Sequence, residues 1–361
     1  MFKFIARRIL ETIPVLFVII TGCFFMIRLV PGGPFDSERR TSPEIQKSLE
    51  AYYGYDKPLY VQYFRYVGNL LHGDLGPSTR YQSRSVNEII ADSAPVSFEL
   101  GCYGMVIAIL IGVSAGVVAS LRPNTATDYV PMTLAMVGVC LPTFVLGPLL
   151  VLAFAMYRAA DLSALAQGVL VAVPALVGAL VAWRGGRRAK WTVAGLLAGG
   201  GLGWLAVLFL TSDHQWFYPS GWSFGPDRVL PALTLGIFYA AYLARLTRGG
   251  MMEILSQDFI RTARAKGAGE GRVILRHALR GGLLPVVSFL GPALAGIISG
   301  SFVVEKIFQI PGLGQQFVTS ATNRDHTMIL GTVIFFAVLI IFFNLLVDVA
   351  QVFLNPRLRF D

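Results

Sequence analysis

The chain has 361 residues, of which 55% are hydrophobic and 14% are charged, and its formal net charge at pH 7 is +9. Because soluble domains carry about 25% charged residues, this composition excludes an ordinary soluble domain, a coiled coil and a disordered chain. It indicates a protein solvated by lipid. The three cysteines lie inside apolar runs and form no C-x-x-C pair, so the sequence predicts neither a disulfide framework nor a cysteine metal site.

Long apolar runs recur along the chain, and a helix needs about 20 apolar residues to cross a bilayer. Eight runs meet or approach this length, so we predict an all-α, polytopic membrane protein with eight spans. The first run stays apolar beyond Cys23, and we therefore expect a retained span and not a cleaved signal peptide. The predicted spans are Ile9–Val30, Val96–Leu121, Val130–Met156, Ser163–Trp183, Trp191–Thr211, Val229–Ala244, Leu283–Val303 and Met328–Leu354.

Basic residues in the loops predict the orientation, because Lys and Arg are retained on the cytoplasmic side. With the N-terminus inside, 18 Lys and Arg residues lie in cytoplasmic segments and 11 in external ones. Seven of the external residues lie in the long loop from Pro31 to Pro95, which also holds eight acidic residues. We therefore predict that both termini are cytoplasmic.

The external segment, residues 31–93, is too long to be a bare connection. Aromatic and apolar residues recur there at roughly helical spacing, as at Tyr60, Phe64 and Val67. We expect a small folded cap, with turns at Pro31-Gly32-Gly33-Pro34 and at Gly73-Asp74-Leu75-Gly76-Pro77-Ser78.

The largest cytoplasmic segment, residues 245–282, predicts two short helices, Glu253–Lys266 and Arg272–Arg280. Three glycines between them predict a sharp bend, because glycine adopts positive φ without a Cβ clash. The residues alone leave two interpretations open, a basic loop near anionic lipid and a docking surface for a partner protein. The glycines are Gly267, Gly269 and Gly271, and the arginines that share one face of the second helix are Arg272, Arg276 and Arg280.

The segment Arg261-Thr262-Ala263-Arg264-Ala265-Lys266-Gly267, followed by His277-Ala278-Leu279-Arg280 and Leu284-Pro285, resembles the cytoplasmic EAA loop of ABC importer permeases in its peptide-transporter form. The resemblance covers nearly the whole chain and points to the B-type subunit of oligopeptide permeases. Its other motifs are Arg7-Arg8-Ile9-Leu10, Tyr55-Asp56-Lys57-Pro58, Gly73-Asp74-Leu75-Gly76-Pro77-Ser78, Pro95-Val96-Ser97, Pro311-Gly312-Leu313-Gly314-Gln315, Asn323-Arg324-Asp325 and Asn355-Pro356-Arg357-Leu358-Arg359.

This resemblance implies the fold of a type I ABC importer transmembrane domain. The chain would form half of a heterodimeric pore in a bacterial cytoplasmic membrane. Its implied partners are a second, C-type permease, two ATPase subunits and an extracytoplasmic peptide-binding protein. The implied organisation is an N-terminal helix at 1–30, a permease domain at 94–354 with a coupling loop at 253–284, and a cytoplasmic tail at 355–361.

The resemblance also implies which residues couple the permease to the ATPase. Ala263 would permit close approach, Gly267 the bend, and neighbouring basic residues would meet acidic groups on the partner. The Glu that names the motif is replaced by Arg261 here, and Gly281 stands where peptide permeases often have Asn. The implied coupling residues are Arg261, Thr262, Ala263, Arg264, Ala265, Lys266, Gly267 and Arg280.

Family members usually show six spans, so the resemblance assigns two of the eight to an insertion. Residues 158–214 predict an inserted transmembrane hairpin around the basic loop at 184–190, which we expect to lie peripheral to the pore. The downstream orientation is unchanged by a pair of added helices.

The sequence predicts no enzyme, because it contains neither a G-x-x-x-x-G-K-[ST] run nor a G-x-S-x-G elbow. We expect no catalytic residue, cofactor or metal in this chain, and the sequence assigns no substrate-binding residue. For the charges near span ends, anchoring or packing is favoured over an ion relay. These charges are Glu11, Arg28, Glu99 and Asp348.

The predicted function is oligopeptide uptake by ATP-driven alternating access. Relatives with dipeptide, nickel-complex or sugar cargo are an alternative. An ion-gradient-driven secondary transporter, which would need paired polar groups at the midplane, and a membrane-embedded enzyme or scaffold are less favoured.

Overall fold

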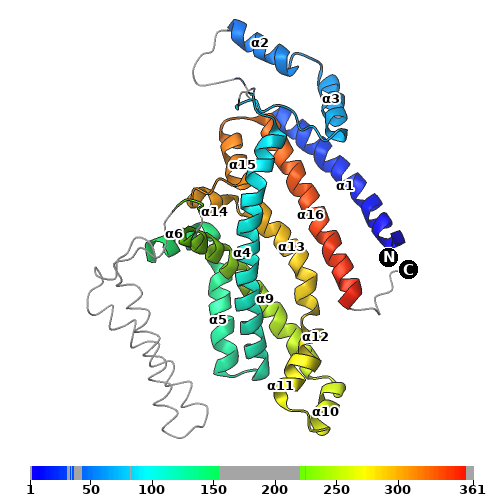
Figure 1. Ribbon diagram of the computed structural model, residues 1–361, viewed down its shortest axis with the longest axis vertical. Helices are drawn as coiled ribbons and strands as arrows, with labels where there is room; N and C mark the ends of the chain where they lie inside the picture. The colour runs from blue at the N-terminus through cyan, green and yellow to red at the C-terminus, as the bar shows by residue number, and fades with distance from the viewer. Residues whose placement is uncertain are drawn as a thin grey trace, which may run out of the picture.

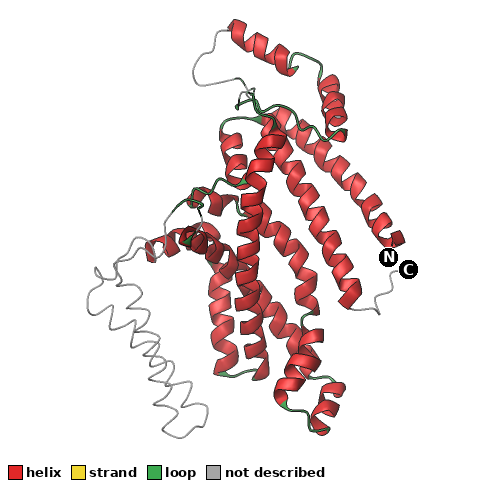
Figure 2. Ribbon diagram, viewed as in Figure 1, coloured by secondary structure: helices red, strands yellow, loops and turns green. Residues whose placement is uncertain are grey.

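A computed structural model of the protein describes residues 2–30, 33, 35, 43–81, 83–153, 220–223 and 225–354. These residues form helices and connecting loops without a β-strand, in agreement with the predicted all-α fold (Figure 2). The predicted hairpin at 158–214, most of the turn at 31–34 and the tail at 355–361 lie outside the described residues.

The described chain is built of α-helices joined by short loops, together with a 3₁₀ turn, labelled η3, and a π-helical turn, labelled η4. In chain order they are α1 (Phe2–Leu29), α2 (Pro43–Tyr53), α3 (Leu59–Leu71), α4 (Val86–Leu121), α5 (Ala126–Cys140), α6 (Thr143–Val151), η3 (Pro226–Arg228), α9 (Val229–Leu255), α10 (Asp258–Ala265), α11 (Glu270–Arg272), η4 (Val273–Ala278), α12 (Leu279–Gly282), α13 (Leu284–Gly300), α14 (Phe302–Ile307), α15 (Leu313–Thr322) and α16 (His326–Leu354).

Five helical segments of the described chain are long and apolar enough to cross a membrane. They are α1, α4, η3 with α9, α13 with α14, and α16. The pair α5 and α6 supplies a sixth crossing if it is counted as one broken span, with a bend of 104°. The described residues thus hold five or six of the predicted spans, and the total of eight stays a prediction.

The prediction of one continuous helix over Val130–Met156 is wrong. The chain breaks at Leu141, which is extended with ψ 113°, and Pro142 follows it. Proline disfavours the α conformation in the residue before it, because its ring crowds that residue's backbone. α6 therefore starts in a new direction after α5.

α4 begins at Val86, ten residues before the predicted start of the span at Val96. A capping box starts it: Ser85 Oγ accepts from the Glu88 amide at 3.2 Å, and Glu88 Oε2 accepts from the Ser85 amide at 3.3 Å. At 1.5 Å per residue the helix is about 54 Å long, well beyond a hydrocarbon core of about 30 Å. Its polar first turns therefore stand outside the membrane.

α4 and α9 pack against each other along the middle of the bundle (Figure 1). Small residues bring their backbones together. A Cβ atom at Gly112 would lie 2.5 Å from the Ala240 carbonyl oxygen, and one at Gly116 would lie 2.5 Å from that of Ala244. Close backbone approach through glycine is the usual basis of helix association in lipid.

The other long helices surround this pair. α13 packs on α16, and α1 runs along α16 at the edge of the bundle (Figure 1). The N-terminal part of α1 is fastened by Arg8, whose Nη2 lies 3.3 Å from Asp348 Oδ2. Asp348, a short side chain near a span end, therefore has a cationic partner.

All four charged residues that the sequence analysis weighed as relay candidates have a polar partner. Three of the contacts join α1 to α16, α1 to α3 and α4 to η3, and the fourth is an exposed pair within α1, so they support anchoring and packing over an ion relay. The partners are Arg7 for Glu11, Gln62 for Arg28, Arg228 for Glu99 and Arg8 for Asp348.

Replacing Gly112 by alanine tests the contact between α4 and α9. We expect Gly112→Ala to destabilise the protein by about 1–3 kcal/mol, the usual cost of overpacking, measured as thermal unfolding in detergent. The matched control is Gly249→Ala on α9, whose added Cβ would meet nothing within 4 Å. Equal stability of the two variants would contradict the proposed packing role.

Candidate functional site

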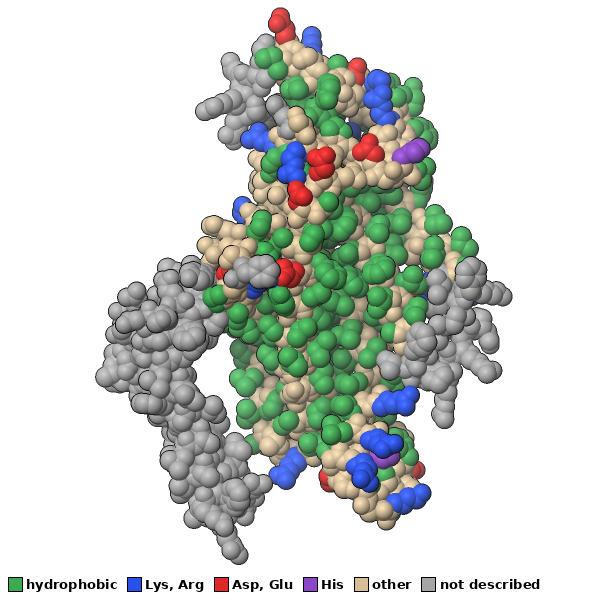
Figure 3. All heavy atoms as spheres, viewed as in Figure 1, with side chains coloured by type: hydrophobic (Ala, Val, Ile, Leu, Met, Phe, Trp, Pro, Cys, Tyr) green, Lys and Arg blue, Asp and Glu red, His purple; other side chains and the backbone are tan. Residues whose placement is uncertain are grey.

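The candidate coupling site is the tip formed by the end of α9, α10, α11, η4 and α12. It lies at the end of the molecule opposite to α2 and α3 (Figure 1). Figure 3 shows Lys and Arg side chains gathered on this tip, below a body covered mainly by hydrophobic side chains. The tip therefore has the charge pattern expected of a segment that leaves the membrane.

α10 is fixed to the rest of the tip by one apolar side chain. Ile260 is fully buried in a cluster with Met251 of α9 and with Val273 and Ala278 of η4. The helix is strongly amphipathic, so this contact determines which of its residues face outward. Its other face carries the predicted coupling residues.

A Schellman motif ends α10 at Gly267, which has φ +78°. The Gly267 amide donates to the Arg264 carbonyl at 2.9 Å, and the Ala268 amide donates to the Ala263 carbonyl at 3.2 Å. The predicted bend is therefore confirmed and depends on Gly267, whereas Gly269 has an ordinary φ of −63°.

Two of the predicted basic coupling residues are paired within the chain. Arg264 forms a bidentate ion pair with Glu270 across the bend, at 2.8 and 3.1 Å. Arg261 lies 3.3 Å from Asp258 on the same helix. The Arg264 guanidinium lowers the pKa of the exposed Glu270 carboxyl, chiefly through its hydrogen bonds. Lys266 has no ion pair with any described residue, and contacts of all three with a partner stay a prediction.

The outer face of the tip also exposes two large apolar side chains that the sequence analysis did not single out. Phe259 is 50% exposed and Leu275 is 71% exposed. Arg272, Arg276 and Arg280 are exposed nearby in η4 and its flanking helices. Exposed large apolar side chains on a segment that also exposes arginines are more typical of a protein interface than of a purely solvated loop.

The remaining predicted residues lie on or next to this face. Thr262 donates its hydroxyl to the Asp258 carbonyl at 3.0 Å, Ala263 is half-buried and Ala265 is exposed. Arg280 lies on α12, separated from α10 by the π-helical turn η4. The structure thus gathers seven of the eight residues on α10 and its C-terminal turn and sets Arg280 on a separate helix.

Close glycine contacts join α12 to α9, and sequence reasoning missed them. A Cβ atom at Gly250 would lie 2.3 Å from the Gly282 carbonyl oxygen. One at Gly281 would lie 2.9 Å from a side-chain carbon of Ile254. The Gly250 contact is with backbone and excludes a side chain there, whereas a side chain at Gly281 would require only the end of the Ile254 side chain to shift.

A buried ion pair braces α9 just before it enters the tip. Arg248 donates two hydrogen bonds to Asp128 at the start of α5, at 2.6 and 2.7 Å, and the Asp128 side chain is almost fully buried. The backbone amide of Asn124 adds a third donor at 2.9 Å. The two partners lie 120 residues apart, so local patterns gave no indication of the pair.

Family motifs that are distant in sequence meet at Glu305, a fully buried residue of α14. Its carboxylate accepts hydrogen bonds from Ser97 Oγ at 2.7 Å, Ser301 Oγ at 2.6 Å and the Gln315 amide at 3.0 Å. The Ser97 hydroxyl in turn accepts from the Leu313 amide at 2.8 Å. The motifs at 95–97 and 311–315 therefore form one hydrogen-bonded unit.

A second buried carboxylate, Asp325, joins another pair of motifs just before the start of α16. It caps α16 through the Met328 amide at 3.1 Å and accepts from Thr79 Oγ1 at 3.0 Å and from Ser78 Oγ. The motif at 73–78 is thereby held against the motif at 323–325. These hydrogen bonds hold the loop between α3 and α4 on the bundle.

Reversing the charges of Arg264 and Glu270 tests the pair that spans the bend. Arg264→Glu places like charges together, so we expect faster hydrogen exchange at the amides of Gly267 and Ala268, by up to about fivefold for an exposed pair. Combining it with Glu270→Arg should restore the slower exchange. If the double variant exchanges as fast as the single one, the ion pair does not hold the bend.

Comparisons with known proteins agree with this architecture. Residues 108–360 match the family described as "Binding-protein-dependent transport system inner membrane component", and residues 1–100 match the N-terminal region of such membrane components. The chain is 41% identical to the oligopeptide transport system permease protein OppB of Haemophilus influenzae and 43% identical to that of Escherichia coli, in both cases over 100% of both chains. It is 36% identical to the dipeptide transport system permease protein DppB of Bacillus subtilis, over 99% of this chain and 98% of that one. The chain therefore belongs to the family of binding-protein-dependent transport system inner membrane components, the multi-pass permease subunits of ABC importers.

Proposed function

We propose that this chain forms half of the pore of an ATP-driven importer and that its cargo is oligopeptides. The observation that carries the proposal is the similarity to OppB proteins over the full length of both chains. A shared fold alone would support a permease without a cargo. Similarity that extends from the first helix through the coupling tip supports the same transport role.

The proposed assembly contains a second permease of the C type, two ATPase subunits on the cytoplasmic side and an extracytoplasmic peptide-binding protein. Both termini of the chain would be cytoplasmic, as the basic loops indicate. The tip around α10 would then face the ATPases, and the segment with α2 and α3 would face the binding protein.

The mechanism we propose is alternating access, in which the ATPases move the tip and the tip moves the bundle. The apolar side chains Phe259 and Leu275 would enter a groove on an ATPase, and basic residues around them would meet acidic groups at its rim. α9 continues from the tip into the membrane over 27 residues, or about 40 Å at 1.5 Å per residue. A displacement of α10 would therefore pass through the contact of Ile260 with Met251 to α9, which would carry it into the membrane as one continuous helix.

The contacts that attach the tip to the helix bundle support its proposed role in transmitting motion. Ile260, the Gly250 contact and the Arg248 ion pair all fasten the tip to α9 or to its neighbour α5. A loosely attached loop would bend when pushed, whereas a loop fixed at several points transmits motion. The catalytic step, ATP hydrolysis, would belong entirely to the partner subunits.

One relative favours a second candidate cargo. The 36% identity to a dipeptide permease admits dipeptides, and the sequence resemblance also admits nickel complexes or sugars. Competition of labelled peptides of two to six residues for uptake would rank these cargos. Uptake confined to dipeptides would replace the oligopeptide proposal with the dipeptide one.

Proline at Gly267 tests the coupling role of the bend. Proline fixes φ near −65° and lacks the amide donor, so Gly267→Pro is incompatible both with φ +78° and with the hydrogen bond to the Arg264 carbonyl. We expect loss of ATP-dependent peptide uptake with unchanged insertion into the membrane. The matched control is Gly269→Pro, whose φ of −63° suits proline. Normal uptake by the Gly267→Pro variant would remove the coupling role.

Purification of the tagged chain from membranes in mild detergent tests the assembly. We expect a second permease and chains with Walker A loops to co-purify, and we expect their yield to fall in the Gly267→Pro variant. Uptake should persist when ion gradients are collapsed and should stop when ATP is removed. The reverse dependence would instead identify a secondary transporter.

A further inference from the structure

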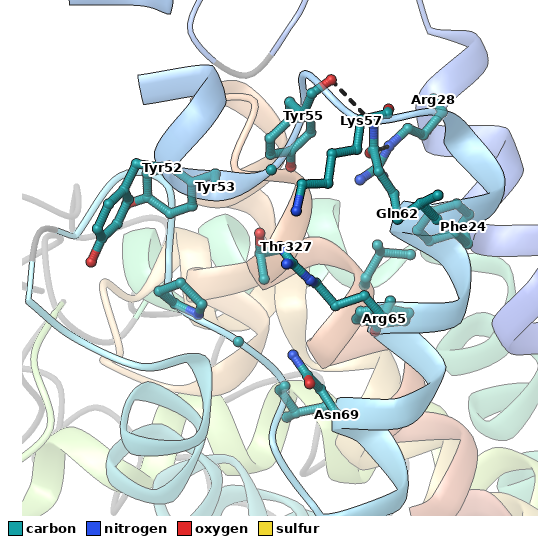
Figure 4. A pocket seen from close by; sticks show the side chains of 17 residues that line it. Phe24, Arg28, Tyr52, Tyr53, Tyr55, Lys57, Gln62, Arg65, Asn69 and Thr327 are labelled. Atoms are coloured by element: carbon teal, nitrogen blue, oxygen red, sulfur yellow. Dashed lines mark hydrogen bonds between the residues drawn. The ribbon is translucent and has the colours of Figure 1, made fainter. Parts of the chain in front are cut away.

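A cavity of about 210 Å³ lies on the external side, between the outer end of α1, α3, the loop that joins α2 to α3 and the start of α16. The family motif Tyr55-Asp56-Lys57-Pro58 contributes part of this loop. Figure 4 shows the Lys57 side chain from the loop and the Arg65 side chain from α3 converging near Thr327. The transport role proposed above leaves this cavity unexplained.

The lining of the cavity is cationic and holds no acidic side chain. Its three charged residues are Arg28, Lys57 and Arg65, and none of them has an ion pair with a described residue. The nearby buried carboxylate, Asp325, is occupied by hydrogen bonds from Ser78, Thr79 and Met328. Lys57 and Arg65 converge (Figure 4) without an ion pair to a described residue, which favours an anion between them. The Arg28 guanidinium lies over the Phe24 and Tyr55 rings, 4.3 and 4.8 Å from their centroids.

Two buried hydrogen-bond donors beside the cavity lack an acceptor. Arg28 uses its Nε to reach Gln62 Oε1 at 2.9 Å, but its buried Nη1 has no hydrogen-bond partner, and neither has the buried Tyr66 hydroxyl. Burial raises the pKa of the Tyr66 phenol, so the hydroxyl is protonated and can donate. Buried donors without acceptors are costly, and a ligand rich in acceptor oxygens would satisfy them.

The cavity lies next to the end of an apolar helix, where the surface of a membrane is expected. Arg28 lies next to the end of the apolar α1 segment, Ala6–Leu29, at the depth where hydrocarbon gives way to head groups. On α3, the side opposite to the cavity exposes Tyr60 by 66%, Phe64 by 69% and Leu71 by 83%. Such a stripe is typical of a helix that lies in the membrane interface.

We propose that this cavity binds a phosphate group, supplied by the head group of an outer-leaflet phospholipid or by free phosphate. Phosphate oxygens accept hydrogen bonds from several directions, which matches the Arg28, Lys57 and Arg65 side chains and the unpartnered Tyr66 hydroxyl. Pockets that enclose whole drug-sized ligands have about 300–1,000 Å³. The cavity is smaller, so a lipid would insert its head group and leave its acyl chains outside.

Native mass spectrometry of the full chain, with its co-purified subunits, tests the proposal. The double variant Lys57→Gln/Arg65→Gln removes two cavity charges that make no hydrogen bond to a described side chain. The matched control, Lys47→Gln/Arg80→Gln, removes the same charges from exposed residues of the external segment that do not line the cavity. The probes are phosphatidylglycerol, diacylglycerol, which lacks the phosphate, and inorganic phosphate.

We expect the wild-type chain and the control to retain at least tenfold more phosphatidylglycerol than the double variant, and diacylglycerol to be retained equally by all three. If free phosphate is the source, inorganic phosphate instead raises the unfolding temperature of the wild type and control but not of the double variant. Equal retention by all variants without a phosphate effect overturns the proposal, as does equal retention of diacylglycerol and phosphatidylglycerol by the wild type.

The single variant Lys57→Gln, in an exposed loop, provides the same comparison if the double variant unfolds. The binding assay needs neither ATP nor peptide. Its outcome is therefore separate from that of the uptake experiments.

Discussion

No side chain separates the backbones of α4 and α9 at Gly112 and Gly116. Lipid tails are as apolar as leucine, so helices in a bilayer gain little from the hydrophobic effect and associate through close packing and hydrogen bonds. The contact between these two helices sets the axis of the bundle. α5, α6, α12 and α13 all pack on α9, and α9 itself continues into the tip that carries α10. The other helices of the bundle are therefore arranged around this pair.

Buried polar groups determine how the remaining segments attach to this pair. Glu305 holds the α14–α15 connection against α4, Asp325 holds the loop between α3 and α4 against α16, and Asp128 holds α5 against α9. Each carboxylate accepts several hydrogen bonds, as buried charges must. Several of the sequence motifs that suggested the family therefore have a structural role. The motif at 95–97 bonds to the unit at 311–315 through Glu305, and the motif at 73–78 bonds to the motif at 323–325.

The helical fold, most span positions and the bend at Gly267 could be predicted, because apolar length and glycine chemistry act locally. The break at Pro142 was overlooked because the apolar run continues across it. Contacts such as Ser97 with Glu305 could not be predicted, since they join residues 208 positions apart. At the coupling tip, the residue positions followed from the family resemblance, but the burial of Ile260 and the exposure of Phe259, adjacent in sequence, depend on how α10 packs.

The environment of Glu305 also constrains the order in which the chain is built. Its carboxylate is fully buried, and its hydrogen bonds with described residues come from two serine hydroxyls and a backbone amide. One donor, Ser97, belongs to a helix synthesised some 200 residues earlier, and another, the Gln315 amide, emerges from the ribosome only afterwards. A carboxylate buried without its hydrogen-bond donors is unfavourable by several kcal/mol. We therefore expect α14 to dock only where α4 is already in place, which would make the final part of the chain depend on its first third during folding.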